Sequence, residues 1–359
     1  MKLNRAGNGT KFSADLESRP LSVRSSVARK RKFTEFIKPM LATLTDEPFD
    51  HADWIFELKW DGYRAVAEVD GRSVKLYSRN GLSFSELYPK VADALAGLNS
   101  HFVLDGEIVV LDENGKPSFQ KLQQFSNYPS LKIVYYVFDC LSYQGKDLKD
   151  LPLLERKKIL RHALVENEVV KYSDHIERAG ISFFKKAVKM NLEGVMAKHA
   201  NSLYDLGRRT GNWLKIKNHN SNEAVIAGYT SPRASRQYFG ALILGIFVKG
   251  TIKYIGHTGT GFTDSILKDL HRKMQPLVRK RSPFDETIPV NTSVTWLVPK
   301  LVCNVKFTEL TNDGLMRHPV FMGLRIDKKA KEVNHVESKM KATRKTPAKV
   351  KKATGKTGG

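Results

Sequence analysis

The sequence predicts an α+β protein with two folded domains between flexible basic tails, the second domain being a small β-barrel. Three observations support this prediction. At 359 residues the chain is more than twice the commonest size of one domain. Strand-like and helix-like stretches alternate before Asn218–Glu223, whereas strand-like stretches dominate after it. Both ends of the chain are basic and poor in large apolar residues.

Residues 1–35 are expected to form a basic N-terminal arm. They contain nine Lys/Arg and three Asp/Glu, a net charge of +6, and Lys30 and Arg31 lie in a run of four basic residues near their end. The arm lacks the apolar stretch of a secretory signal. The longest apolar run of the chain, Ala241–Val248, is too short to span a membrane. We therefore expect a cytoplasmic protein.

The first domain, residues 36–219, opens with a strand that runs into the segment Lys59–Arg64. Asp70-Gly71 is typical of a two-residue hairpin loop, which predicts that Val69 pairs with Arg72 and that Gly62 faces Arg79. Lys59, Arg64 and Arg79 would then lie close together. Three neighbouring cations indicate a phosphate site.

Lys59 is a candidate nucleophile at the end of an apolar strand. A free lysine has a pKa of about 10.4, which would have to fall toward 7 for the amine to attack. Nearby arginines, partial burial and a metal ion would all lower that pKa. An ordinary surface lysine is the alternative.

The strand predicted at Val103–Val110 places Asp105 and Glu107 on one face, as a metal or ribose-hydroxyl site would need. A salt bridge at a sheet edge would explain the same pattern. The apolar run Lys132–Phe138 predicts a buried strand. Phe138 then lies either at a pocket mouth or in the core.

Leu153–Leu164 and Ile181–Leu192 have helical spacing. The strand predicted at Leu192–Lys198 carries an acid and a base, Glu193 and Lys198. In the next strand, Trp213–Lys217, alternation places Lys215 and Lys217 on one face with Trp213. Such a lysine pair suits a phosphate, although a solvated face has the same pattern.

The second domain, residues 220–332, contains short strand-like runs and one helical stretch, SILKDLHRKM. This pattern suits a small β-barrel such as the OB-fold. The glycine-rich segment Gly256–Gly261 lacks the lysine spacing of a phosphate-binding loop. We interpret it as turns between barrel strands.

Residues 333–359 are expected to form a disordered tail, with eight Lys/Arg, among them Lys349, Lys351 and Lys352, and a net charge of +7. Of the formal net charge of +23, +10 remains between the two ends. A polyanion, most commonly nucleic acid, is the partner that such a charge favours. Two cysteines are too few for a disulfide framework or a zinc cluster.

The order of several short motifs is more specific than any one of them. Together they resemble the six nucleotidyltransferase motifs of ATP-dependent DNA ligases, with an arrangement closest to the ligase module of bacterial ligase D. The segment GLRIDK (Gly323–Lys328) matches that group too. The resemblance implies a nucleotidyltransferase (adenylation) domain followed by an OB-fold. The motifs are KWDGYR (Lys59–Arg64), SRNG (Ser78–Gly81), LDGEIV (Leu104–Val109), YVFD (Tyr136–Asp139), EGVMAK (Glu193–Lys198) and WLKIK (Trp213–Lys217).

The resemblance implies that Lys59 attacks the α-phosphate of ATP and carries AMP to a 5′-phosphate in DNA. Glu57 would hold the adenine edge, and Phe138 would stack on the base. Glu107 would meet the ribose of ATP or a metal ion, and Glu193 would be the best ligand for Mg²⁺ or Mn²⁺. Further ATP contacts and assistance to the chemistry are implied for Arg64, Arg79, Lys198, Lys215, Lys217, Arg325, Asp327 and Lys328.

By family pattern Lys198, Lys215 and Lys217 hold the AMP phosphate. Arg325, Asp327 and Lys328 would orient the pyrophosphate during the first step only. Arg64, Arg79 and the basic tails are the expected DNA contacts.

The implied partner is nicked or broken double-stranded DNA, handled by a monomer near the bacterial nucleoid in repair, recombination or end joining. A Ku-like end-binding protein and separate polymerase or nuclease modules are possible partners. Two alternatives stay open at this point: an RNA ligase or capping-type nucleotidyltransferase, and a non-catalytic basic OB-type DNA-binding protein. The lack of a four-cysteine site argues against the zinc-containing, NAD-dependent ligases.

Overall fold

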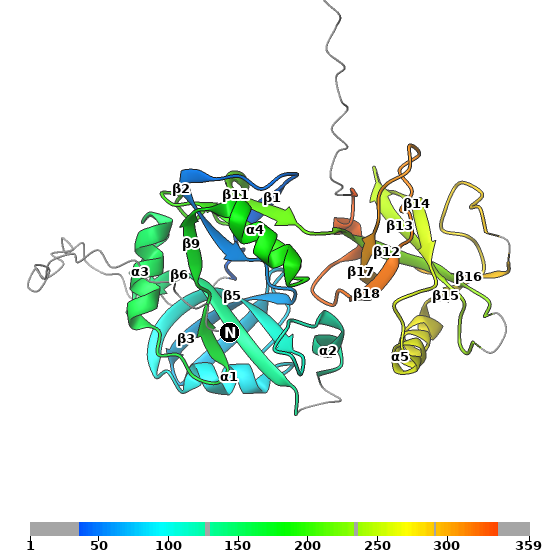
Figure 1. The fold of residues 1–359 in the computed structure, drawn as a ribbon. Coiled ribbons are helices and arrows are strands. Elements are labelled where there is room, and N and C mark those ends of the chain that lie inside the picture. Colours follow the sequence, from blue (N-terminus) through cyan, green and yellow to red (C-terminus); the bar gives the residue numbers. More distant parts are fainter. Residues whose placement is uncertain (1–35, 126–129, 233–235, 291, 337–359) are drawn as a thin grey trace, which may run out of the picture.

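The computed structural model describes residues 36–125, 130–232, 236–290 and 292–336 (Figure 1). The predicted DNA-binding residues of the tails lie outside this part, namely Lys30, Arg31, Lys349, Lys351 and Lys352. The described residues form three sheets and five α-helices, which confirms the predicted α+β class. No described helix is long and apolar enough to cross a membrane.

One five-stranded sheet of the N-terminal half has the order β1-β11-β10-β2-β9. β1 and β11 are parallel and the other neighbours are antiparallel. Helix α4 (Gly180–Lys189) packs Phe183 and Ala187 onto this sheet, because residues four apart share one helix face. The strands are β1 (Leu41–Thr45), β2 (His51–Leu58), β9 (His175–Arg178), β10 (Gly194–His199) and β11 (Arg209–Lys217).

A second sheet has the order β4-β3-β5-β6-β7, with β8 beside β6. Helices α1 (Pro89–Ala96) and α3 (Leu153–Ala163) pack on it, and the short helix α2 (Phe119–Gln123) follows β5. β6 is largely buried, as its apolar run predicts. The strands are β3 (Tyr63–Gly71), β4 (Ser73–Ser78), β5 (Ser100–Leu111), β6 (Lys132–Tyr143), β7 (Lys146–Asp147) and β8 (Val170–Tyr172).

The predicted register of the β3–β4 hairpin is wrong by one residue on each strand. Asp70 pairs with Ser73, so the loop is Gly71-Arg72 and not Asp70-Gly71. Gly71 has φ +60°, and glycine at the first loop position favours the type II′ turn. Arg79 therefore follows the pair Ala65–Ser78 directly and does not lie opposite Gly62. The three cations still line one cavity, as described below.

The C-terminal half is a barrel of seven strands around one apolar core. Its β12 pairs with β13, β16 and β17. Helix α5 (Asp264–Met274) begins at Thr263, whose hydroxyl accepts from the Ile266 N–H, and buries Leu267 and Leu270. The strands are β12 (Asn220–Thr230), β13 (Leu242–Val248), β14 (Thr251–Thr258), β15 (Val278–Arg279), β16 (Val294–Leu297), β17 (Val302–Phe307) and β18 (Val320–Leu324).

Two further details of the barrel differ from the predictions. Gly256–Thr258 belongs to β14, and the rest of the glycine-rich segment leads into α5, so it is not a set of turns between strands. Residues 333–336, predicted as the start of the tail, pack on the barrel: the Val333 carbonyl accepts from the Phe247 N–H at 2.7 Å. Two 3₁₀ turns complete the described structure, Gln275–Leu277 and Ala330–Glu332.

Candidate active site

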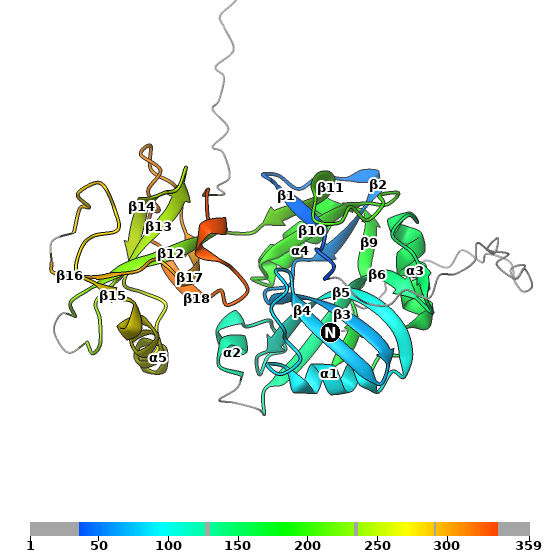
Figure 2. The same ribbon diagram turned by 180° about the vertical axis from the view of Figure 1, so that it is seen from behind.

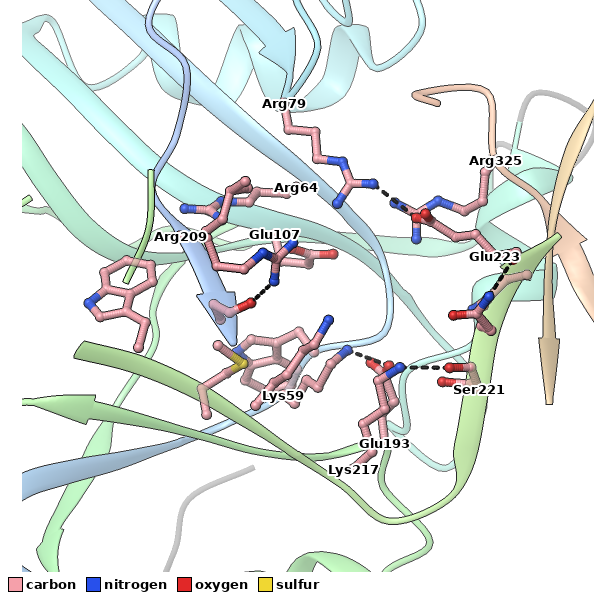
Figure 3. A pocket seen from close by; sticks show the side chains of 18 of the residues that line it. Lys59, Arg64, Arg79, Glu107, Glu193, Arg209, Lys217, Ser221, Glu223 and Arg325 are labelled. Carbon is pink, nitrogen blue, oxygen red and sulfur yellow. Dashed lines mark hydrogen bonds and ion pairs between the residues drawn. The ribbon is translucent and has the colours of Figure 1, made fainter. Parts of the chain in front are cut away.

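A cavity of about 500 Å³ lies where the two N-terminal sheets meet the barrel (Figure 3). Charged side chains dominate its wall. The residues from the first sheet are Glu57, Lys59, Met196, Lys198, Arg209, Trp213, Lys215 and Lys217; those from the second are Arg64, Glu107 and Phe138; those from the barrel include Glu223, Asn304, Arg325 and Lys328.

The backbone holds Lys59 in place at the end of β2. Its N–H donates to the Gly194 carbonyl at 3.0 Å. The next residue, Trp60, stacks on Tyr136 with ring centroids 3.7 Å apart, and its Nε1 donates to the Ser173 hydroxyl. The Lys59 side chain is thereby directed into the cavity, where it forms an ion pair with Glu193 (Figure 3).

The predicted fall in the pKa of Lys59 is wrong for this structure. Burial lowers that pKa, but the carboxylates of Glu193, Asp61 and Glu107 together outweigh burial and the net direction is upward. The arginines that were expected to lower it are themselves neutralised. Arg64 makes a bidentate pair with Asp105, at 2.6 and 2.9 Å, and Arg79 pairs with Glu223 at 2.9 Å.

Carboxylates crowd the same region. Burial raises the pKa of Glu107 to about 8, and burial together with the charge of Glu193 raises the pKa of Asp61 to about 7. An added cation would relieve both effects. Among the described residues no three His, Cys, Asp or Glu side chains form a metal cluster. Oxygen donors from two carboxylates plus substrate phosphates are the usual Mg²⁺ arrangement, so Glu107 and Glu193 fit such an ion.

Beside Glu57 the cavity wall combines a buried carboxylate, two lysines and aromatic rings. Glu57 is 1% exposed and accepts from Lys157 at 2.7 Å and from Lys198 at 2.8 Å. Burial raises its pKa, but the two lysines outweigh it and the net direction is downward. The Lys198 ammonium also lies 4.2 Å from the ring centroids of both Phe138 and Trp213. This placement beside an aromatic wall does not favour the phosphate contact predicted for Lys198.

Strand β11 supplies the predicted lysine face. Trp213, Lys215 and Lys217 line the cavity, while Leu214 and Ile216 pack against the core under α4. The Lys217 ammonium donates to the Ser221 carbonyl at 2.7 Å. Arg209, at the start of β11, also lines the cavity and was not predicted.

The barrel closes the cavity with an ion-pair network. Arg325 makes a bidentate pair with Asp327, at 2.7 and 2.8 Å. Glu223 accepts from Arg79 of the first half and from Lys328, both at 2.9 Å. Asp327 is 3% exposed and Arg79 approaches it to 3.7 Å. Asp327 thus forms ion pairs with Arg325 and Arg79 and does not itself line the cavity. Arg325 and Lys328 do line it.

Sequence reasoning missed Lys157 and Glu223. A signal for Lys157 existed, because Leu153, Lys157 and Leu160 share one helix face and a lysine among leucines on a buried face needs a partner. Glu223 directly precedes the apolar part of β12 and carries no comparable signal.

Comparison with known proteins identifies the family. The family described as "ATP dependent DNA ligase domain" matches residues 39–217, and "ATP dependent DNA ligase C terminal region" matches residues 235–328. The chain belongs to the ATP-dependent DNA ligases. This is a family of enzymes that form phosphodiester bonds, and membership of it argues against the RNA-end and non-catalytic alternatives.

Individual relatives agree with this ligase assignment. The multifunctional non-homologous end joining protein LigD of Pseudomonas aeruginosa is 38% identical over 314 residues, and its namesake in Mycolicibacterium smegmatis is 36% identical over 310. Each alignment covers 85% of this ligase but only 37% and 40% of the relative. The chain thus spans about two-fifths of these proteins.

A solved structure is matched over nearly its whole length. The structure described as mycobacterial DNA ligase D complexed with ATP and MES is 34% identical, with a TM-score of 0.65. The match covers 84% of this chain and 99% of that one. The adenylation domain and OB-fold predicted for the sequence are confirmed by these likenesses.

Proposed function

We propose that the enzyme seals 5′-phosphate/3′-hydroxyl breaks in double-stranded DNA through a lysyl-AMP formed on Lys59 and a DNA-adenylate. One observation carries this proposal: the Lys59 amine is held in a cavity that offers both a base and phosphates suitable partners. Glu57 and Phe138 supply a polar and an aromatic group, and Lys215, Lys217, Arg325 and Lys328 supply cations.

In the first step the Lys59 Nζ attacks the α-phosphorus of ATP. The Lys59 ammonium first gives a proton to a base, for which the Glu193 carboxylate in contact with Nζ is suited. A P–N bond then forms, the P–O bond to pyrophosphate breaks, and the second amine proton leaves with the pyrophosphate. The protein's main task is to position groups and stabilise charge. Lys215, Lys217, Arg325 and Lys328 would balance the phosphate charge, with Asp327 orienting Arg325.

In the second step an oxygen of the DNA 5′-phosphate attacks the phosphorus of the lysyl-AMP, and Lys59 leaves. In the third step the 3′-hydroxyl attacks the 5′-phosphorus, a phosphodiester forms, and AMP and the hydroxyl proton are released. Arg64 and Arg79 are the proposed DNA contacts beside the nucleotide. Arg79 can serve DNA only after it leaves Glu223 and Asp327.

Glu107 and Glu193 are the side chains that would hold Mg²⁺ or Mn²⁺. The ion would neutralise phosphate charge as the phosphoryl group is transferred. In the same cavity, Glu57 would accept from the adenine amine, and Phe138 would stack on the base.

The biological setting belongs to the same proposal. LigD relatives named for non-homologous end joining support a role in repair at broken ends, with a Ku-like protein and separate polymerase or nuclease modules as partners. We further propose domains at 36–219 and 220–332, a monomeric enzyme and a place near the bacterial nucleoid. The family matches at 39–217 and 235–328 support the division into domains.

Labelling with α-³²P-ATP and Mg²⁺ tests the nucleophile. The wild type should retain label on a denaturing gel, and Lys59→Ala should retain none, because the proposed P–N bond needs the Lys59 amine. Lys75→Ala, an exposed lysine on β4, is the matched control and should label normally. Label that survives in Lys59→Ala would refute the assignment.

A further inference from the structure

The contact between α2 and β18 joins the two halves of the enzyme at a point outside the nucleotide cavity. Helix α2 lies on the side of the first half that faces the barrel (Figures 1 and 2). Gln123, its last residue, donates from Nε2 to the Leu324 carbonyl at 3.2 Å. Its Oε1 accepts from the Leu324 N–H at 3.0 Å. The side-chain amide therefore makes the two-way exchange that a paired residue makes in an antiparallel sheet.

β18 needs such a partner because it lies at a sheet edge. Within the described residues it pairs with β17 alone. The outward N–H and C=O groups of an edge strand must be satisfied by other means. At Leu324 the Gln123 amide satisfies both, and the Tyr63 hydroxyl donates to the same carbonyl at 2.9 Å. Both partners come from the first half of the chain.

Gly323 makes this close approach possible. A Cβ at position 323 would lie 1.5 Å from the Nε2 of Gln123, and the residue has φ +144°, a conformation that favours glycine. The Gln123 side chain thus occupies the space that any other residue at 323 would fill. The contact is a specific fit between one side chain and one stretch of backbone.

The same helix also supports the next residue of the barrel. The Arg325 guanidinium lies 5.7 Å from the ring of Phe119 and 5.6 Å from the ring of Tyr63. Phe119 and Gln123 are four residues apart and share a face of α2. The helix therefore holds the backbone at Leu324 and the side chain at Arg325, immediately before Asp327 and Lys328.

We propose that Gln123 is a positioning residue for self-adenylylation: it docks β18 on α2, so that Arg325 and Lys328 face the phosphates of ATP. This rests on the proposed function of those residues in the first step. Gln123 does not itself line the nucleotide cavity. We confine the role to the first step, because the same arrangement keeps Arg79, a proposed DNA contact, paired with Glu223 and Asp327.

The test compares Gln123→Ala with Gln124→Ala, whose side chain makes no hydrogen bond to any described residue. Lysyl-AMP formation is followed in single-turnover labelling at saturating ATP and Mg²⁺, and sealing is followed on a pre-adenylylated nick. Loss of two neutral hydrogen bonds should slow adenylylation roughly tenfold in Gln123→Ala. Sealing by Gln123→Ala, and both steps in Gln124→Ala, should stay within about twofold of wild type.

Gln123→Asn guards against a general folding defect, because it keeps an amide but is too short to reach Leu324. It should match Gln123→Ala in the first step. Normal adenylylation in either variant, or an equal loss in both steps, would overturn the docking role. A wild type without any adduct would instead refute the proposed function, so the two failures are distinguishable.

Discussion

At the scale of single residues, the cavity is organised by carboxylates that hold its cations. Glu193 holds Lys59, Asp105 holds Arg64, and Glu223 holds Arg79 and Lys328. Each pair fixes a long side chain before any phosphate arrives. The chemistry of Lys59 therefore depends on displacing an ion pair and not on a lysine that is already neutral.

Lys157 is a buried lysine that holds Glu57, which lines the cavity. Its ammonium donates to Glu57 and to the carbonyls of Phe138 and Ser173. Lys157→Met leaves the buried Glu57 with Lys198 alone, which should lower the free energy of unfolding by about 3–5 kcal/mol. Urea unfolding measures this, with Lys158→Met, an exposed neighbour, as the control. Equal stability of the two variants would contradict the prediction.

Asp327 gives a prediction about pH. Burial raises its pKa, but Arg325 and Arg79 outweigh burial and the net direction is downward from the ordinary value of 3.8. A group with a lowered pKa stabilises the fold above its unfolded pKa and loses that contribution as the pH falls through the folded pKa. Asp327→Asn should therefore be less stable than wild type by about 3 kcal/mol, and this gap should stay constant from pH 8 to pH 5.

Thermal melts of wild type and Asp327→Asn, from pH 8 to below pH 3.8, measure this difference in stability. Asp313→Asn, an exposed aspartate in the barrel, should show no gap. The difference should narrow only below about pH 3.8, where the unfolded aspartate takes up a proton. A gap that narrows between pH 8 and pH 5 would show that another group controls the effect.

At the scale of elements, the junction of β10 and β11 places Glu193 beside Lys59. Gly194 has φ +148°, and a Cβ there would lie 2.1 Å from the Ile216 carbonyl oxygen. Gly194→Ala should therefore cost about 2–3 kcal/mol of stability and reduce labelling of Lys59, because it moves Glu193. Gly211→Ala on β11, where a Cβ meets nothing within 4 Å, is the matched control. Normal labelling in Gly194→Ala would refute this.

Local patterns predicted the elements well and their long-range partners poorly. The alternation in Trp213–Lys217 predicted which side chains face the cavity, because strand geometry alone determines that. The predicted β3–β4 register was wrong because Asp70-Gly71 and Gly71-Arg72 can both form the two-residue loop. The predicted direction of the Lys59 pKa was wrong because Glu193 is 134 positions away in the chain, and no local pattern indicates that contact.

At the scale of the whole molecule, the barrel contacts the first half through the network at Glu223 and through Gln123. Arg79 is bound to Glu223 and Asp327 in this arrangement. A closed barrel therefore occupies the same arginine that we propose for DNA. Closure for ATP and engagement of DNA would then be alternative states of one set of charges.

The basic C-terminal segment leads to a last prediction for the whole enzyme. Residues 337–359 carry eight Lys/Arg and one Glu, whereas Val333–Val336 pack on the barrel, so a truncation should keep the latter. Each tail cation that contacts a DNA phosphate adds about 0.9 to the slope of log affinity against log salt. Removing 337–359 should weaken binding and make that slope shallower, as measured by fluorescence anisotropy on nicked DNA. Lys349→Gln, Lys351→Gln and Lys352→Gln together should give a smaller change in the same direction. An unchanged slope in the truncated enzyme would mean that the tail does not contact DNA, and the body charge alone would account for binding.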